Sequence, residues 1–257
     1  MTNILFLYDN LIDSATLTES SEESGFPAEN VQHPFRTKVW TTDGGTPGTA
    51  NLVINHGSAK AVNCIVLANY DWTSAPGTLD IEFNATDSWA GPSHTESLTW
   101  AANPSVNGNK AVIVKKFATQ TYQYNRLNVV YATGDWSLGR IFLGEYFEPT
   151  KNYQYKWGQN MLDDSETART IGGQDHIDEI EMYRMVQFKT LIKTQAQWEL
   201  YQKMVNSVGR NKELFIAFDY DNEPNEMTQY GTFTKLPGMS SPFTNLFEIG
   251  FNFKESR

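Results

Sequence analysis

Two of the seven tryptophans lie in turn-rich segments, where an exposed ring is able to bind a ligand. Trp72 stands in the segment YDWTSAPG and Trp89 in TDSWAGP. An indole ring in a loop can stack on a sugar ring, because the apolar face of a sugar matches a flat aromatic surface. We therefore take Trp72 and Trp89 as candidate carbohydrate-binding residues. The alternative is that both rings cover a sheet end or a contact between subunits.

Residue types that bind metals or cofactors are present, but their spacing does not fit such sites. The chain has four histidines, which are His33, His56, His94 and His176. No two of them stand two or four residues apart, so no zinc or iron site is predicted. The segment that begins at Asp219 starts like a calcium loop, but Pro224 replaces the glycine and Tyr230 the bidentate glutamate. Phosphate-binding and dinucleotide-binding glycine motifs do not occur, so we predict no cofactor.

Catalytic residues are not predicted either. Asp163 and Asp164 are adjacent in a polar stretch, which favours solvated carboxylates over a glycosidase pair. Cys64, the single cysteine, lies among apolar residues in VNCIVLANY and is predicted to be a buried strand residue. No nucleophile elbow of the GxSxG type occurs. We expect a protein without catalytic activity, with a glycan hydrolase as the enzymatic alternative.

Composition and charge exclude several classes of partner. The chain has 257 residues, of which 40% are hydrophobic, enough to form one large core or two ordinary ones. Its formal net charge of −10 argues against a surface that grips nucleic acid, so DNA is expected only as passing cargo. The start, MTNILFLYDN, lacks a basic leader, and no run approaches the ~20 apolar residues of a membrane span. We expect a soluble chain that is made in a reducing cytoplasm, or that ends up outside without Sec-type export, and that does not insert into a membrane.

The first 150 residues read as short strands separated by Gly, Pro and Asn. The expected strands cover residues 3–9, 51–57, 61–70, 78–85, 111–118, 124–133 and 139–148. No helical period is present, so this part is predicted to be an antiparallel β-sandwich or jelly roll. The irregular stretch FPAENVQHPFRTKVWTT ends near Trp40, which we expect to fill one end of the sandwich.

The pattern changes near Pro149, where we place a boundary between domains 1–150 and 151–257. A long strand over 176–192 is followed by a helix over about 195–208, with Thr194 as its N-cap. The helix carries an apolar stripe, formed by Trp198, Tyr201, Val205 and Val208. Three further strands, over 213–220, 229–236 and 244–255, make this part α+β. Arg184 interrupts the alternation of the long strand and should reach an edge or a partner.

The first 150 residues resemble a discoidin-type, galactose-binding-like jelly roll. The resemblance rests on FPAENVQHPFRTKVWTT, NLVINHGSAKAVNCIVLANY and YNRLNVVYATGDWSLGRIFLGEYFE. In that family a Pro-Ala-x-Asn loop leads to a Trp that fills the end of the sandwich, which would be Trp40 here. The disulfide that usually joins the termini in that family is absent, because the chain has one cysteine. The absence of this disulfide implies a version of the fold that is assembled inside the cell. Contact between the jelly-roll loops and glycans on a host surface is the alternative function.

The second part is similar to the distal tail and tail-tube proteins of long-tailed bacteriophages. The similarity rests on GRIFLGEYFEPTKNYQY, TQAQWELYQKMVNSVGRNKELFIAFDYD and FEIGFNFKES. It implies a structural virion protein of the tail tip or baseplate, which is assembled in the host cytoplasm. Proteins of this kind form rings, often of six subunits, so the similarity implies a hexameric ring here. Its partners would be the tail tube, the tail hub and fibre or receptor-binding proteins. The alternative function is a carbohydrate-binding module that uses Trp72 and Trp89.

Overall fold

The computed structural model describes residues 3–35, 37–43, 49–100, 102, 111–131, 134–154, 157–169, 172–243 and 246–256, with the backbone alone at 49 and 241–243. As predicted, the chain is mainly β, with antiparallel sheets. It divides into two compact units. The first contains Met1–Glu148 and Phe215–Gln229, and the second contains Pro149–Leu214 and Tyr230–Arg257. No helix in the described ranges is both long and apolar enough to cross a membrane.

The first unit contains a β-sandwich that is formed by one continuous, folded sheet. The strand order is β3 (Trp40–Thr41), β8 (Ser137–Gly144), β4 (Thr49–Tyr70), β7 (Ala111–Val130), β5 (Thr78–Asn84) and β6 (His94–Ser97), and β2 (Thr16–Glu19) also pairs with β4. Two short 3-10 helices, η1 (Leu11–Ser14) and η2 (Ala28–Gln32), precede β3. The predicted β-sandwich jelly roll is therefore present in this unit.

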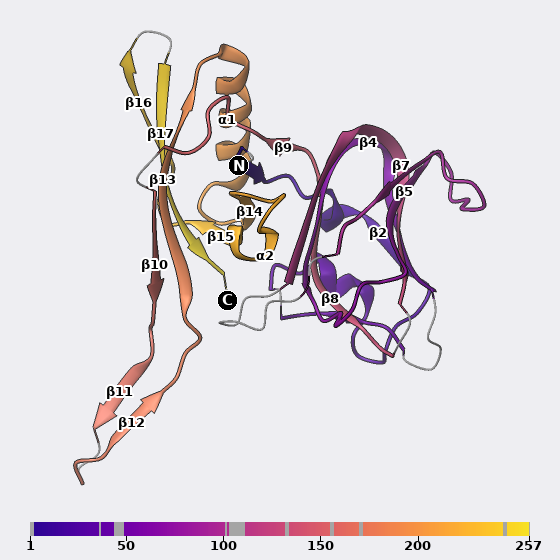
Figure 1. Cartoon of the computed structure of the whole chain (residues 1–257), viewed down its shortest axis with the longest axis horizontal. Coiled ribbons are helices and arrows are strands. Elements are labelled where there is room, and N and C mark those ends of the chain that lie inside the picture. Colours follow the sequence, from indigo (N-terminus) through magenta and orange to yellow (C-terminus); the bar gives the residue numbers. More distant parts are fainter. Residues whose placement is uncertain are drawn as a thin grey trace. The chain divides into compact units, whose positions relative to one another are not determined.

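Two long strands, β4 and β7, build both layers of the sandwich. They pair from Thr49 opposite Val130 to Tyr70 opposite Ala111, and their register shifts after Asn55. Figure 1 shows the two strands bending together as an arch. Gly57 lies at this bend with a φ of 73°, a value that favours glycine. The sequence predicted two strands in place of each long one, because a glycine and polar residues interrupt the apolar pattern.

The arch divides the sheet into two layers. The first half of β4 pairs with β2, and the second half of β7 pairs with β5. We call this side, with β6, the β5 layer. The second half of β4 pairs with β8, which forms the opposite layer together with the first half of β7 and with β3. Each long strand thus passes from one layer into the other, which closes the sandwich at the arch.

Trp40 fills the end of the sandwich that lies opposite the arch. Its side chain is fully buried, and its Nε1 donates to the Ser21 carbonyl at 3.0 Å. Trp40 is paired with Leu138 in β3 and β8, and its ring meets the ring of Trp136 edge-on, with 4.9 Å between centroids. The prediction that Trp40 fills one end is confirmed.

The segment Phe215–Gln229 belongs to the first unit, although the predicted second domain included it. In β14 (Leu214–Ala217), residues Phe215, Ile216 and Ala217 pair with β1 (Leu5–Leu7), whose other edge pairs with β9 (Tyr146–Phe147). The short helix α2 (Pro224–Met227) follows, and Asn225 Oδ1 accepts a hydrogen bond from the Val112 amide at 2.7 Å. Such long-range pairing leaves no signal in local sequence patterns, so the prediction missed it.

The second unit is an antiparallel sheet covered by one helix. β17 (Leu246–Glu255) pairs with β13 (Tyr183–Ile192) along one edge. Its other edge pairs with β16 (Gly238–Phe243) and with the end of β15 (Thr228–Phe233), while β10 (Gly158–Leu162) pairs with β13. The rings of Phe188 and Phe251 stack on the buried face, with 4.9 Å between centroids.

Helix α1 (Gln195–Val208) has the predicted bounds. Thr194 Oγ1 accepts from the Gln197 amide at 3.3 Å, and Gly209 ends the helix with a φ of 58°. The predicted N-cap is therefore confirmed. The buried stripe contains Tyr201, Met204 and Val208, so the prediction missed Met204, while Trp198 and Val205 are only partly buried.

The predicted long strand over 176–192 is broken in two. β12 (Asp175–Asp178) pairs with β11 (Glu166–Arg169), and β13 begins only at Tyr183. We call the described residues of the range 158–182 the ribbon. It contains β10, which pairs with β13, and the paired strands β11 and β12, which lead away from the rest of the second unit's sheet (Figure 1). Arg184 lies at the base of the ribbon and binds Glu255 through Nε and Nη2, both at 2.8 Å. The prediction that Arg184 reaches a partner is confirmed.

Candidate functional site

Trp72 lies in the core and presents no ring face to solvent. Its side chain is fully buried, stacked on Tyr70 at 4.7 Å and edge-on to Trp136 at 5.5 Å between ring centroids. β4 ends at Tyr70, and Trp72 packs against the same aromatic cluster that contains Trp40. The predicted role of Trp72 in stacking on sugars is wrong, because a turn-like sequence does not show whether its side chain points inward.

Trp89 lies in the turn between β5 and β6 and is partly exposed. Its Nε1 donates to Asp87 Oδ1 at 2.7 Å, and the guanidinium carbon of Arg126 lies 4.8 Å from the centre of its ring. The turn is held by Asn84, which donates to the Ser88 carbonyl at 2.5 Å and accepts from Ser93 Oγ at 2.9 Å. The indole therefore has a fixed position beside an arginine.

Trp89 borders a sheet face that is made almost entirely of polar side chains. Ile81, Leu127 and Ile54 are buried in the core, so the alternate residues of their strands point outward. The outward face of the β5 layer, which we call the polar face, consists of Trp89 and the residues Asn51, Val53, Asn55, Asp80, Glu82, Tyr124, Arg126 and Asn128. Carboxylate, amide, hydroxyl and guanidinium groups therefore lie side by side on adjacent strands.

The centre of the polar face is an ion pair. Arg126 Nε lies 2.5 Å from Glu82 Oε2, and the two side chains are only 16% and 9% exposed. The carboxylate of Glu82 fixes the guanidinium where it also contacts Trp89. Within the described part of the chain, the buried Oδ1 atoms of Asn51 and Asn128 accept no hydrogen bond. These two residues are neighbours in the register, and Asp80 is next in the same row.

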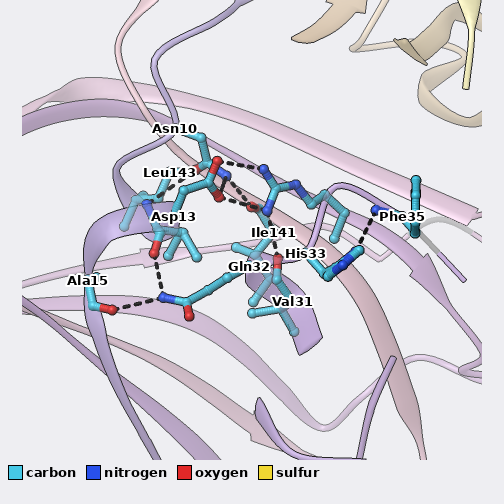
Figure 2. A network of polar contacts seen from close by, with 11 residues as sticks. Asn10, Asp13, Ala15, Val31, Gln32, His33, Phe35, Ile141 and Leu143 are labelled. Carbon is cyan, nitrogen blue, oxygen red and sulfur yellow. Dashed lines mark hydrogen bonds and ion pairs between the residues drawn. The ribbon is translucent and has the colours of Figure 1, made fainter. Parts of the chain in front are cut away.

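A second polar cluster, on the opposite layer, is structural (Figure 2). Arg140 is 5% exposed, and its guanidinium donates to the Val31 carbonyl at 3.1 Å and to Asp13 Oδ2 at 2.7 Å. Asn10 donates to the Ile141 carbonyl at 2.9 Å. Figure 2 shows these contacts tying the segments near Asn10 and Val31 to β8. These hydrogen bonds hold the N-terminal segments of the first unit against the sandwich.

Cys64 and the adjacent acidic residues Asp163 and Asp164, which were also considered from the sequence, differ widely in exposure. Cys64 is fully buried, as predicted, and burial raises the pKa of its thiol. In the ranges that the structure describes, no group of three or more His, Cys, Asp or Glu residues is placed to hold a metal ion. Asp163 and Asp164 are exposed at the start of the ribbon.

Sequence reasoning missed the polar face, although part of its signal was present. The alternation in TLDIEFNA places Asp80 and Glu82 outward, and YNRLNVVYAT places Arg126 and Asn128 outward. The missing information was the register that sets Glu82 opposite Arg126. Register depends on the pairing of segments more than forty residues apart, which a single sequence does not specify.

No family model matches the chain, and no curated protein is similar to it in sequence. Solved carbohydrate-binding modules are similar to about half of it. The chitosan-binding module 1 of a chitosanase/glucanase from Paenibacillus sp. IK-5 is 20% identical, with a TM-score of 0.41, and the match covers 54% of this chain and 100% of the module. At this level the similarity carries no conclusion about ligands.

Two further structures have similar values. A fucose-binding module from Streptococcus pneumoniae is 13% identical with a TM-score of 0.41, over 53% of this chain and 95% of the module. The family 32 module of C. perfringens NanJ, solved in complex with galactose, is 17% identical with a TM-score of 0.41, over 56% of this chain and 98% of the module.

Proposed function

We propose that the first unit binds a carbohydrate on its polar face, without catalysis. The observation that carries this proposal is the partly exposed, fixed ring of Trp89 at the margin of a row of amide and carboxylate side chains. A sugar offers one apolar face for stacking and several hydroxyl groups that both donate and accept hydrogen bonds. Trp89 matches the first feature, and Asn51, Asn128 and Asp80 match the second.

The charges of the polar face favour a neutral or amino sugar over an acidic one. Glu82 already neutralises Arg126, so Asp80 gives the face a net negative charge. The whole chain also carries a formal net charge of −10. Like charges in an interface raise the free energy of binding, so sulfated and sialylated glycans would be rejected.

A glycan array with the full chain tests this proposal. We expect binding to neutral or amino-sugar glycans, and Trp89→Ala should weaken it by about 30-fold, since removing a central aromatic contact typically costs about 2 kcal/mol. Trp157→Ala, which removes a partly buried tryptophan of the second unit, is the matched control. Equal binding by the Trp89 variant and the wild type would exclude the polar face as the site.

A second candidate function concerns the second unit: a structural virion subunit of a phage tail tip or baseplate. The observation that favours it is the ribbon, whose described side chains are nearly all exposed and include four large apolar ones. Such surfaces are usually covered by a partner. In this function the chain would form a ring, with six subunits as the sequence resemblance implies, and would contact tube, hub and fibre proteins.

Light scattering on the purified chain, followed by electron microscopy of particles that carry a labelled copy, tests the structural function. An oligomer of defined size and a label at the tail tip would support it. A chain that stays monomeric at high concentration and is missing from particles would contradict it, and glycan binding by the first unit would then stand alone.

A further inference from the structure

The ribbon combines exposed apolar side chains with a high negative charge. Met161, Ile177, Ile180 and Met182 are each between 37% and 55% exposed. The ribbon's sequence holds seven acidic residues and one arginine, which are Asp163, Asp164, Glu166, Asp175, Asp178, Glu179, Glu181 and Arg169. A two-stranded ribbon of this kind is marginally stable alone, so a partner surface that is apolar and positively charged would stabilise it.

A groove with these properties lies elsewhere in the same unit. It has a volume of about 720 Å³ and lies between β16 and the outward residues of β13 and β17. The exposed apolar side chains of Leu236 and Met239 line it, together with Lys189, Lys235 and Glu248. The groove therefore offers a mixed surface, in which apolar side chains lie beside polar ones and positive side chains outnumber negative ones, in a chain whose net charge is strongly negative.

The free charge of the groove comes from Lys235. Lys189 Nζ lies 2.7 Å from Glu248 Oε1, and hydrogen bonds from Lys189 and Gln154 hold the pKa of Glu248 below its ordinary value, so this pair stays ionised and is internally neutral. None of the ion pairs between described residues includes Lys235, which is exposed. An acidic partner would therefore be attracted to Lys235.

We propose that the groove of one copy of this chain receives the ribbon of a second copy. The proposal rests on the structural function of the second unit and names its contact surface. The two surfaces are complementary in chemistry. The apolar side chains of Ile177 and Met182 would pack on Leu236 and Met239, and carboxylates of the ribbon would pair with Lys235. Figure 1 shows β11 and β12 far from β16 within the second unit, so one copy does not fill its own groove.

Because the ribbon and the groove are different surfaces, the contact is heterologous. A pair of copies then keeps one free ribbon, on one copy, and one free groove, on the other, and a series of such contacts closes into a ring or grows as a filament. Contact between two ribbons would instead be isologous and would stop at a dimer. This difference separates the two arrangements in a cross-linking experiment.

Two single-cysteine variants, Ile177→Cys and Met239→Cys, carry different tags and are mixed with a short bis-maleimide. Cys64 is fully buried, so the wild type serves as the unreactive control. The proposal predicts a covalent heterodimer in the mixture and no covalent dimer of either variant alone. Dimers of the Ile177 variant alone, or no product in the mixture, would overturn it.

Charge reversal provides an independent test. Lys235→Glu should weaken self-association about tenfold at low salt, measured by sedimentation, because it places a negative charge beside the acidic ribbon. Lys212→Glu changes an exposed lysine outside the groove by the same charge and should have little effect. Equal self-association of the two variants would contradict the docking.

Failure of this contact is distinguishable from failure of the structural function. If light scattering shows an oligomer but the mixture gives no heterodimer, the subunit function stands and the ribbon–groove contact is wrong. If the wild type remains monomeric and is missing from particles, and no heterodimer forms, both are wrong.

Discussion

The guanidinium of Arg126 is held in place at the candidate site by two neighbouring side chains. Its Nε binds Glu82, and its guanidinium carbon lies 4.8 Å from the centre of the Trp89 ring. A guanidinium that is fixed by a carboxylate loses little side-chain entropy when a ligand binds beside it. The position of Trp89 is therefore determined by residues of β5 and β7 as well as by its own turn.

The two tryptophans chosen from the sequence should differ in their effect on stability. Trp72→Ala removes a fully buried ring and should lower the free energy of unfolding by about 3–5 kcal/mol. Trp89→Ala removes a partly exposed ring and should cost about 1 kcal/mol or less. Urea denaturation of both variants measures the difference, and similar losses would contradict the burial of Trp72.

His56 should make stability depend on pH. Burial lowers the pKa of His56, the hydrogen bond with Asn125 opposes this change, and Lys60 adds to the lowering. The folded state therefore holds His56 neutral more strongly than the unfolded chain does. The stabilisation is complete above the unfolded pKa of about 6.5 and is lost as the pH falls through the lower pKa of the folded state.

Urea unfolding of the wild type and His56→Gln between about pH 8 and about pH 5 measures this effect. We expect the wild type to lose more stability than the variant as the pH falls. If the two lose the same amount over this range, His56 does not contribute to the pH dependence.

At the scale of elements, α1 was predictable and β4 was not. Thr194, the spaced apolar residues and Gly209 act within one stretch of chain, so they specify the helix bounds locally. β4 continues through Gly57 because β7 pairs with it on both sides of the bend. The sequence shows a turn-forming glycine there, and only the partner strand shows that the same strand continues beyond this glycine.

Helix α2 offers a test of how the returning segment is held. Asn225 accepts from the Val112 amide at 2.7 Å and donates to the Ala102 carbonyl at 2.9 Å. Asn225→Ala should speed hydrogen exchange at the Val112 amide and cost about 1–2 kcal/mol, because it leaves backbone groups without partners.

Asn222→Ala is the control, since Asn222 donates to the side chain of Asp219 at an exposed position. It should change the free energy of unfolding by less than about 0.5 kcal/mol. Unchanged exchange at Val112 in the Asn225 variant would show that this contact does not hold the segment in solution.

At the scale of the whole molecule, the formal net charge of −10 limits the partners. A polyanion such as DNA is repelled by such a surface unless lysines and arginines are concentrated in one place. We expect no retention of the full chain on duplex DNA at physiological salt in a mobility-shift assay. Retention that weakens steeply with added salt would contradict this expectation.

The proposed carbohydrate site is tested most directly by ¹H–¹⁵N NMR. A glycan that binds on the array is added while the indole Nε1–H signals of the seven tryptophans are recorded. Trp40, Trp72 and Trp136 are buried in the first unit's core, whereas Trp89 lies at the polar face. We predict that the Trp89 signal moves in proportion to the bound fraction while the three core signals stay in place. An unmoved Trp89 signal at saturation would contradict the proposed carbohydrate site.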